Sequence, residues 1–374
     1  MKVPVPKIRT APNDMVHLDV LRIVASLAIM IYHFRGHLVV SGVFQTIIDR
    51  LGGLEIVVDM FFFISGFVII RFYNNIDTVS EYLLFLWKRI ARLYPLHFAT
   101  LIIFVTFSMI IILTDIHVRN PGQFDLRCFW VNAALLQSIN MCRTLTFNPV
   151  SWSISAEMLI YCCLPVILFL RRWKFMTLFV GVIWWVCVAT HWPQGSAKPW
   201  SGLSFDYGFV RAVPSFLLGV ASYDFRHRII ALPGGEALMW SILGLILVLM
   251  LLGTNETLLV FLAFASVLSA IAADARARPS RVARAVAPLA ALTYSLYLIH
   301  PIVDLIFISL IAKKILHASD SAITCVVVLA VPVTFAFAYL SYTLFENPAR
   351  RRLSGWYAKR SSLTMSVADR HTPL

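Results

Sequence analysis

The chain has 374 residues, of which 59% are hydrophobic and only 14% are charged, and its mean hydropathy is +0.80. This composition leaves too little polar surface for a soluble globular protein and indicates a polytopic membrane protein. The net charge of +13 does not require nucleic acid, because topology signalling and contact with anionic lipid account for it. We therefore expect a lipid bilayer around the chain and no nucleic-acid partner.

Ten apolar segments are long enough to cross a bilayer, which predicts an all-α fold with about ten transmembrane helices. They lie near residues 18–38, 54–72, 97–115, 151–170, 174–191, 207–224, 236–253, 256–274, 287–311 and 321–344. Residues 127–139 are too few to cross, so we expect a re-entrant or surface helix there. Residues 1–15 are polar, and we expect no cleavable signal peptide. The segments on one side of these spans hold 22 of the 32 lysines and arginines, so both termini are predicted to be cytoplasmic.

The first span carries Asp19, Arg22 and His33, although charge inside hydrocarbon is costly and commonly functional. Arg22 and His33 are eleven residues apart, which at 100° per residue is three turns plus about 20°, so they share one helix face. Along the axis they are separated by roughly 16 Å. One helix therefore places functional side chains at two depths of the membrane. The alternative is that Arg22 only extends to a lipid headgroup and that His33 is a packing histidine.

Two carboxylates are predicted at the depth of His33. Counted from the outer ends of their spans, Asp59 lies about five residues inside the second span and Glu157 about six inside the fourth. Because isolated charges at that depth are expensive, we expect His33, Asp59 and Glu157 to face one polar cavity open to the outside. The alternative for Glu157 is a structural ion pair with a buried cation such as Arg211 in the sixth span.

The segment 71–96 ends in a basic amphipathic stretch in which Arg89 and Arg92 share a helix face. Such a stretch is most often a lipid anchor. It stands, however, on the side that Arg22 approaches. Several guanidiniums at one depth suit a nucleotide or phosphate ester, which they bind bidentately.

Six cysteines are scattered without the paired spacing of a metal site, so we predict no bound metal. Cys128 and Cys142 both lie on the predicted outer side, where a disulfide can form. If residues 127–139 are helical, however, their Cα atoms are about 20 Å apart, whereas a disulfide tolerates no more than about 7 Å. We therefore predict that these two cysteines are not bonded.

The ninth span contains a further polar group near mid-membrane. It includes Tyr297, His300 and Pro301, and the proline is expected to kink the helix and free the Tyr297 carbonyl. His300 and Asp304 are four residues apart on one face, a spacing that coincidence at a proline kink explains adequately. We expect Tyr297 and His300, together with Arg211, to contribute to substrate binding.

Seven motifs follow one another along the chain. They are Arg22 with His33, GGLEIVVDMFFFISGF, KRIARLYP with Arg89 and Arg92, SWSISAE ending at Glu157, RAVPSFLLG beginning at Arg211, YSLYLIHP with Tyr297 and His300, and the terminal FENPARR. Their order and spread, over most of residues 16–352, resemble the acyltransferase 3 family of integral-membrane acyltransferases. Each motif alone is modestly specific, but seven in sequence make coincidence improbable.

The resemblance implies transfer of an acyl group, usually acetyl, from cytoplasmic acyl-CoA to a hydroxyl of an extracytoplasmic polysaccharide or glycolipid, in the bacterial inner membrane. It also implies that Arg22 and His33 are the hallmark pair and that Arg89 and Arg92 handle the acetyl-CoA donor. The physical interpretation agrees, because roughly 16 Å from Arg22 to His33 is comparable to an extended pantetheine arm. His33 is then the general base, with Asp59 or Glu157 fixing its tautomer.

Two other classes of function are compatible with the sequence. A secondary transporter would also place polar residues at the midplane of about ten helices, but transporters commonly show repeat symmetry, and we find none here. A sensor or scaffold that has lost its chemistry is disfavoured by the Arg, His and Glu set. We expect one transmembrane domain over residues 1–352 and a short polar cytoplasmic tail over 353–374. The loops do not select among exopolysaccharide, O-antigen, a lipid-linked oligosaccharide and a small secreted metabolite as the acceptor.

Overall fold

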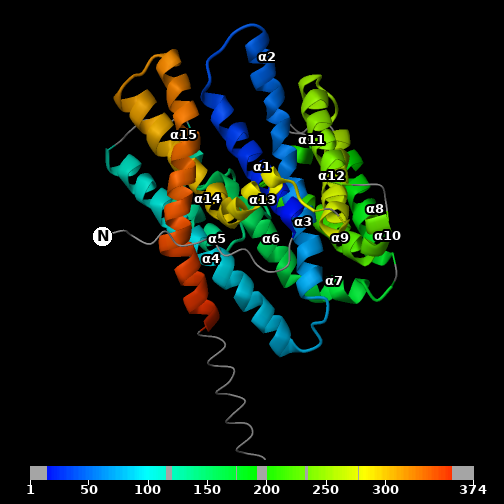
Figure 1. The fold of residues 1–374 in the computed structure, drawn as a ribbon. Helices are drawn as coiled ribbons and strands as arrows, with labels where there is room; N and C mark the ends of the chain where they lie inside the picture. The colour runs from blue at the N-terminus through cyan, green and yellow to red at the C-terminus, as the bar shows by residue number, and fades with distance from the viewer. Residues whose placement is uncertain are drawn as a thin grey trace, which may run out of the picture.

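The computed structural model describes residues 15–114, 120–173, 175–191, 200–231, 235–276 and 278–355, and these residues form helices and no strand. The α-helices are α1 (Val16–Phe34), α2 (Val43–Arg50), α3 (Val57–Phe72), α4 (Val79–Thr114), α5 (Phe129–Ala133), α6 (Trp152–Cys162), α7 (Leu164–Leu170), α8 (Met176–His191), α9 (Gly208–Asp224), α10 (Arg226–Ala231), α11 (Glu236–Leu251), α12 (Glu256–Arg276), α13 (Arg281–Val286), α14 (Thr293–Val303) and α15 (Asp320–Ser341). Shorter 3-10 segments include η1 (Arg35–His37), η2 (Leu51–Ile56), η3 (Pro121–Phe124) and η7 (Ala287–Leu292), and two π-helical segments are η8 (Asp304–Ile315) and η9 (Tyr342–Glu346). Figure 1 shows their arrangement as one helical bundle. Most of the predicted tail, residues 356–374, lies outside the described residues, as do residues 1–14.

The prediction of an all-α membrane protein is confirmed, but the count of ten spans is not. In the described part of the chain, six helices are long and apolar enough to cross a bilayer, or seven if α6 and α7 are one span bent by 57°. Every predicted apolar segment contains helix. However, α8 and α11 have only 16 residues each, below the roughly 20 that a straight span needs. The predicted helix at 127–139 is reduced to the five residues of α5.

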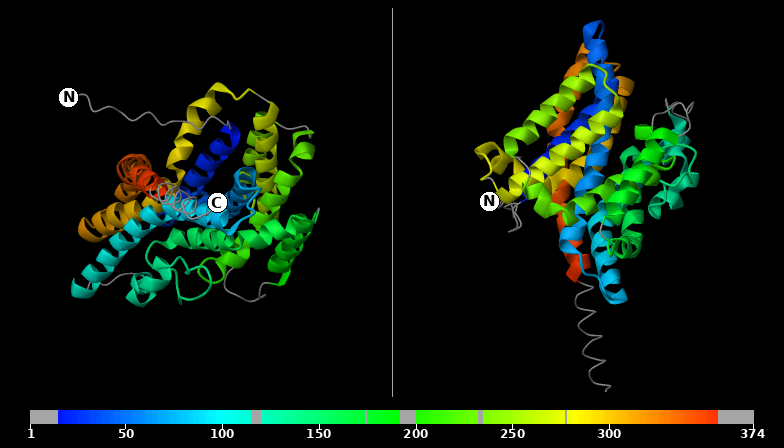
Figure 2. Two further views of the ribbon diagram at one scale, coloured as in Figure 1. Left: turned by 90° about the horizontal axis from the view of Figure 1, so that it is seen from below. Right: turned by 90° about the vertical axis from the view of Figure 1, so that its right-hand side faces the viewer.

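Helix α1 lies inside the bundle, where it contacts α3, α12, α14, η2 and η7. The left view of Figure 2 shows α1, in dark blue, enclosed by elements from along the whole chain. Leu18, Leu21 and Ala25 of α1 are fully buried in the largest apolar cluster, which also includes residues of α3 and α12. This burial explains how a helix that carries Arg22 and His33 is held in place by its other faces.

Two glycines let α3 and α9 approach each other backbone to backbone. A Cβ atom on Gly66 of α3 would lie 2.1 Å from the Phe216 carbonyl oxygen, and one on Gly219 of α9 would lie 2.0 Å from the Phe63 carbonyl oxygen. Small residues at helix contacts are the usual basis of close packing in membranes, where hydrocarbon offers no driving force of its own. The Ser65-Gly66 pair therefore belongs to a packing interface, as does the Gly219 end of the RAVPSFLLG motif.

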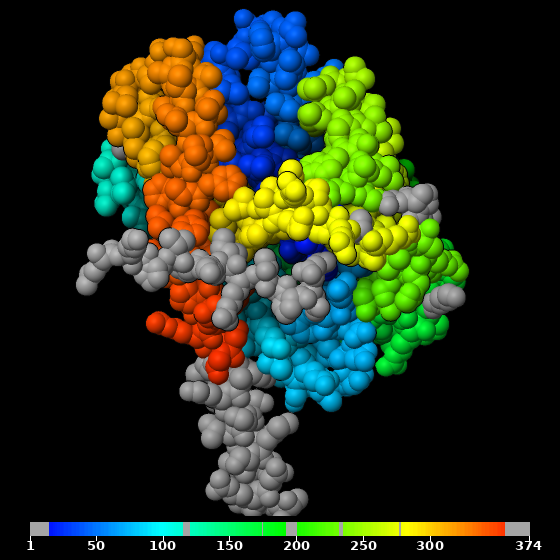
Figure 3. Space-filling model, in the orientation of Figure 1, coloured from blue at the N-terminus to red at the C-terminus, as the bar shows by residue number. Residues whose placement is uncertain are grey.

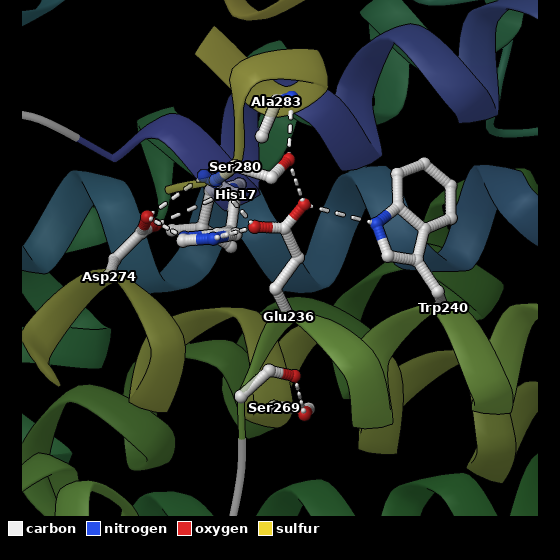
Figure 4. Close-up of polar contacts among 9 residues, drawn as sticks. His17, Glu236, Trp240, Ser269, Asp274, Ser280 and Ala283 are labelled. Carbon is white, nitrogen blue, oxygen red and sulfur yellow. Dashed lines mark hydrogen bonds and ion pairs between the residues drawn. The ribbon is translucent and has the colours of Figure 1, made fainter. Parts of the chain in front are cut away.

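The start of α1 is tied to three other helices by a polar cluster around the buried His17 (Figure 4). Its Nδ1 lies 2.6 Å from Asp274 Oδ1 in α12, and its Nε2 lies 3.3 Å from Glu236 Oε2 in α11. The Ser280 hydroxyl, at the N-cap of α13, donates to Glu236 over 2.5 Å. In Figure 3 the yellow segment around α13 crosses the front of the molecule beside the dark blue α1. The cluster thus fixes the depth at which α1 begins.

The prediction that Cys128 and Cys142 are not bonded is wrong, because the structure joins them by a disulfide with 6.1 Å between their Cα atoms. The expected separation assumed a helix that continued past residue 133. Instead, α5 ends at Ala133, and Leu135 and Asn140 have positive φ angles of 56° and 61°. The chain therefore doubles back and returns Cys142 to Cys128.

Candidate active site

A cavity of about 120 Å³, here called the arginine cavity, lies among α1, α3, α4, α6 and α14. Three arginines line it: Arg22 from α1, and Arg89 and Arg92 from α4. The structure therefore brings together the three cations that the sequence predicts for one site, although Arg22 is almost seventy positions before Arg89 and Arg92. Guanidiniums gathered at one depth are suited to a ligand with several negative charges.

Contacts to aromatic and acidic side chains hold two of these guanidiniums. Arg89 donates from Nη2 to the Tyr73 hydroxyl over 3.0 Å, and its guanidinium lies 5.0 Å from the Tyr73 ring centroid and 5.5 Å from that of Phe85. Arg22 donates to Asp19 Oδ1, one turn earlier on α1, over 3.1 Å. Because both side chains are oriented before any ligand arrives, less conformational entropy is lost when they bind an anion.

Glu157 faces the arginine cavity and not the cavity that contains His33. Its carboxylate accepts hydrogen bonds from the hydroxyls of Ser65 in α3 and Tyr161 in α6. The expectation that Glu157 shares a polar cavity with His33 is therefore wrong. Counting residues from a span boundary gives a depth along the membrane normal, but it does not give the direction in which a side chain points.

Asp59 is also engaged elsewhere, in a buried ion pair with Arg211. Asp59 is 0% exposed and Arg211 is 2% exposed. Arg211 donates to Asp59 Oδ2 from Nη2 over 2.7 Å and from Nε over 3.1 Å, and the Ser215 hydroxyl donates to Oδ1 over 3.1 Å. Arg211 further donates to the backbone carbonyls of Ser201 and Glu55. Asp59 is thus placed to hold α3, α9 and the 200–203 turn together, and the expectation that it faces the His33 cavity is wrong.

His33 lines a larger cavity of about 650 Å³, here called the histidine cavity, between α1, α4, α14 and η8. His37 lines the same cavity, and its Nε2 lies 2.7 Å from Asp304 Oδ1. The carboxylate of this cavity is therefore Asp304 and not Asp59 or Glu157. His37 was missed from the sequence, although it is four residues after His33, a spacing that places two side chains on one helix face.

Tyr297 and His300 of α14 stand between the two cavities. Tyr297 lines the arginine cavity, and its ring centroid lies 6.1 Å from that of His300. The His300 ring in turn lies 5.1 Å from the ring of His33, which lines the histidine cavity. His300 Nδ1 is 3.1 Å from the Leu296 carbonyl oxygen, so Nδ1 carries the proton and Nε2 has a free lone pair. Nε2 is buried and has no hydrogen-bond partner in the described part of the chain.

Comparison with known proteins gives the class of this site. A family model described as an acyltransferase domain matches residues 15–343, which include every residue of both cavities. Searches of the curated proteins and of the solved structures found no match. The matched span covers most of the chain and six of the seven motifs, and it ends two residues before FENPARR. The chain therefore belongs to the acyltransferase 3 family and is a membrane acyltransferase.

Proposed function

We propose that the protein transfers an acyl group, acetyl by family preference, from cytoplasmic acyl-CoA to a hydroxyl of a glycan or glycolipid on the outer face of the bacterial inner membrane. The observation that supports this proposal is the pair of cavities, between which the rings of Tyr297, His300 and His33 follow one another. The arginine cavity lies toward the predicted cytoplasmic end of α1, and the histidine cavity lies toward its other end. Donor and acceptor can thus approach one point from opposite sides of the membrane.

The arginine cavity is the proposed donor site. Arg22, Arg89 and Arg92 would hold the phosphates of coenzyme A by charge-assisted hydrogen bonds. The cavity itself is small, about 120 Å³, so it suits the pantetheine arm better than the bulkier nucleotide. Roughly 16 Å of helix separates Arg22 from His33, so an extended arm brings its thioester to the row formed by Tyr297 and His300.

His33 is the proposed general base. An alcohol is too weak an acid to attack a thioester unaided, so His33 takes the hydroxyl proton as the hydroxyl oxygen forms a bond to the thioester carbonyl carbon. The carbon–sulfur bond then breaks, and the proton passes to the departing sulfur, which leaves as the free thiol of coenzyme A. Asp304 lines the same cavity and pairs with His37, and its negative charge favours the transient imidazolium of His33.

The test is transfer by purified protein in nanodiscs. Acetyl-CoA carrying a labelled acetyl group is added with a glycan acceptor, and released thiol and labelled acceptor are measured together. We expect the wild type to produce both in equal amounts, and His33→Ala to produce neither above background. A wild type that releases no thiol in nanodiscs, but transports labelled solute when reconstituted in sealed vesicles, would refute the proposal and favour a transporter.

A further inference from the structure

The histidine cavity is much larger than a hydroxyl and an acetyl group require. Its volume, about 650 Å³, falls in the range of pockets that enclose a whole ligand of drug size. The donor arm enters from the other side under the proposed function. The space in the histidine cavity is therefore available to the acceptor, and its lining reports what kind of molecule the acceptor is.

One long wall of this cavity is apolar. Phe107, Ile110 and Ile111 of α4 face Leu305 and Leu310 of η8 across it. A sugar chain from the aqueous phase would leave its hydroxyls without hydrogen-bond partners against such a wall, which is unfavourable. A hydrocarbon chain has no such cost.

The same wall reaches the lipid-facing surface of α4. Ile110 lines the cavity and is also 44% exposed, and its neighbours Ile112 and Leu113 are 61% and 83% exposed. A lipid-facing helix surface normally carries no polar groups, whereas this cavity also contains His33, His37 and Asp304. The cavity is therefore amphipathic and adjoins the exposed apolar surface of α4, which distinguishes it from the ordinary contact of a membrane protein with bulk lipid.

A cationic end completes the lining. Lys313 and Lys314, in the last turn of η8, line the cavity ten residues or so from Asp304, which is at most about 15 Å of helix. The predicted topology places this end of η8 on the outer side, where lysines run against the positive-inside rule. A pair of them at the mouth of an apolar cavity complements an anionic group such as a phosphate.

We propose, on the basis of the function proposed above, that the acceptor is a glycolipid whose sugar is joined through phosphate to a long hydrocarbon chain. The glycolipid enters sideways from the outer leaflet. Its hydrocarbon lies between α4 and η8, its phosphate contacts the Lys313–Lys314 end, and its sugar hydroxyl turns toward His33. A released polysaccharide and a small soluble metabolite would leave the apolar wall unfilled, because neither has a hydrocarbon anchor.

The test uses probes that carry parts of this chemistry. Native mass spectrometry of the detergent-purified protein measures the affinity of farnesyl phosphate, farnesol and glucose 1-phosphate. We expect farnesyl phosphate to bind at least tenfold more tightly than either of the others, because only it has both the hydrocarbon and the anion. Equal binding of farnesol would show ordinary lipid contact, and tighter binding of glucose 1-phosphate would show a site for free sugar phosphates. Either result overturns the proposal.

Matched variants locate the binding. Ile110→Trp fills the apolar wall and should weaken farnesyl phosphate at least tenfold, whereas Ile112→Trp, on the same helix but outside the cavity, should leave it within twofold. Leu310→Trp repeats the test from the opposite wall. Lys314→Gln should weaken farnesyl phosphate but not farnesol, and the exposed Arg143 provides the charge control as Arg143→Gln. Equal effects of Ile110→Trp and Ile112→Trp would overturn the assignment of the cavity.

The proposal and the proposed function fail differently. Labelled acetyl transfer is compared between glucose linked to farnesyl phosphate and glucose 1-phosphate. Transfer to glucose 1-phosphate at an equal or higher rate removes the glycolipid acceptor and leaves the acyltransferase intact. Binding of farnesyl phosphate without thiol release from acetyl-CoA under any acceptor removes the proposed function, and with it the acceptor role of the cavity.

Discussion

The buried pair of Asp59 and Arg211 yields the sharpest prediction, because the sequence assigns Asp59 to catalysis and the structure gives it a partner that stabilises the fold. In Asp59→Ala, Arg211 stays 2% exposed and keeps its bonds to backbone carbonyls, but it loses the carboxylate that balances its charge. Breaking a buried ion pair by removing one partner costs about 3–5 kcal/mol. That is a large share of the roughly 5–15 kcal/mol that holds a typical folded protein together.

The assay is the monodisperse, folded fraction after detergent extraction, together with a thermal melt. Asp59→Ala should lose most of its folded protein. Asp125→Ala removes an ion pair whose arginine, Arg127, is 84% exposed, and it should leave the folded fraction and the melting temperature near those of the wild type. The double variant Asp59→Leu, Arg211→Met should recover much of the loss, because it leaves no unpaired charge. A fully folded Asp59→Ala with an unchanged melt and no transfer would refute the structural role and restore the catalytic one.

Three further predictions concern the two cavities and the helix interface. His33→Ala should lower transfer about 10²–10⁴-fold while abundance and melting stay near those of the wild type, and a large loss of folded protein would instead indicate a packing role. Arg89→Ala and Arg92→Ala should each raise the apparent KM for acetyl-CoA more than they lower turnover at saturation. Each variant should lose about 1.5–3 kcal/mol of donor binding. If calorimetry shows unchanged donor affinity in both variants, the two arginines serve as a lipid anchor instead. Gly219→Ala should abolish folded protein because its Cβ would overlap the backbone of α3, whereas Gly244→Ala, with no atom within 4 Å of the added Cβ, should behave as the wild type; equal yields would show that α3 and α9 separate readily.

The helices and the gathering of arginines were accessible to sequence reasoning because both depend on local pattern. Apolar runs place the helices, and the position of Arg89 and Arg92 before a span sets their depth near that of Arg22. The number of spans was less accessible. Hydropathy alone does not reveal that α8 and α11 end after 16 residues, or that the α6–α7 segment bends at Cys163.

The partners of the carboxylates could not be predicted, because they depend on contacts between distant parts of the chain. Asp59 and Arg211 are 152 positions apart, and Ser65 and Glu157 are 92 apart. A depth count places His33, Asp59 and Glu157 in one layer, yet a layer contains every direction around each helix. The disulfide was missed for a related reason. The chain reverses direction at Leu135, which needs a left-handed backbone conformation there, and leucine gives no sequence signal for that conformation.

The glycine contacts between α3 and α9 have a consequence for how the molecule can move. Two backbones within reach of a single missing Cβ cannot slide along each other without collision, so these helices must travel as one rigid body. Ser65 and Glu157 meet across the same body, and the Asp59–Arg211 pair fastens it. We therefore expect any rearrangement that admits a large molecule on the side where α4 and η8 line the histidine cavity.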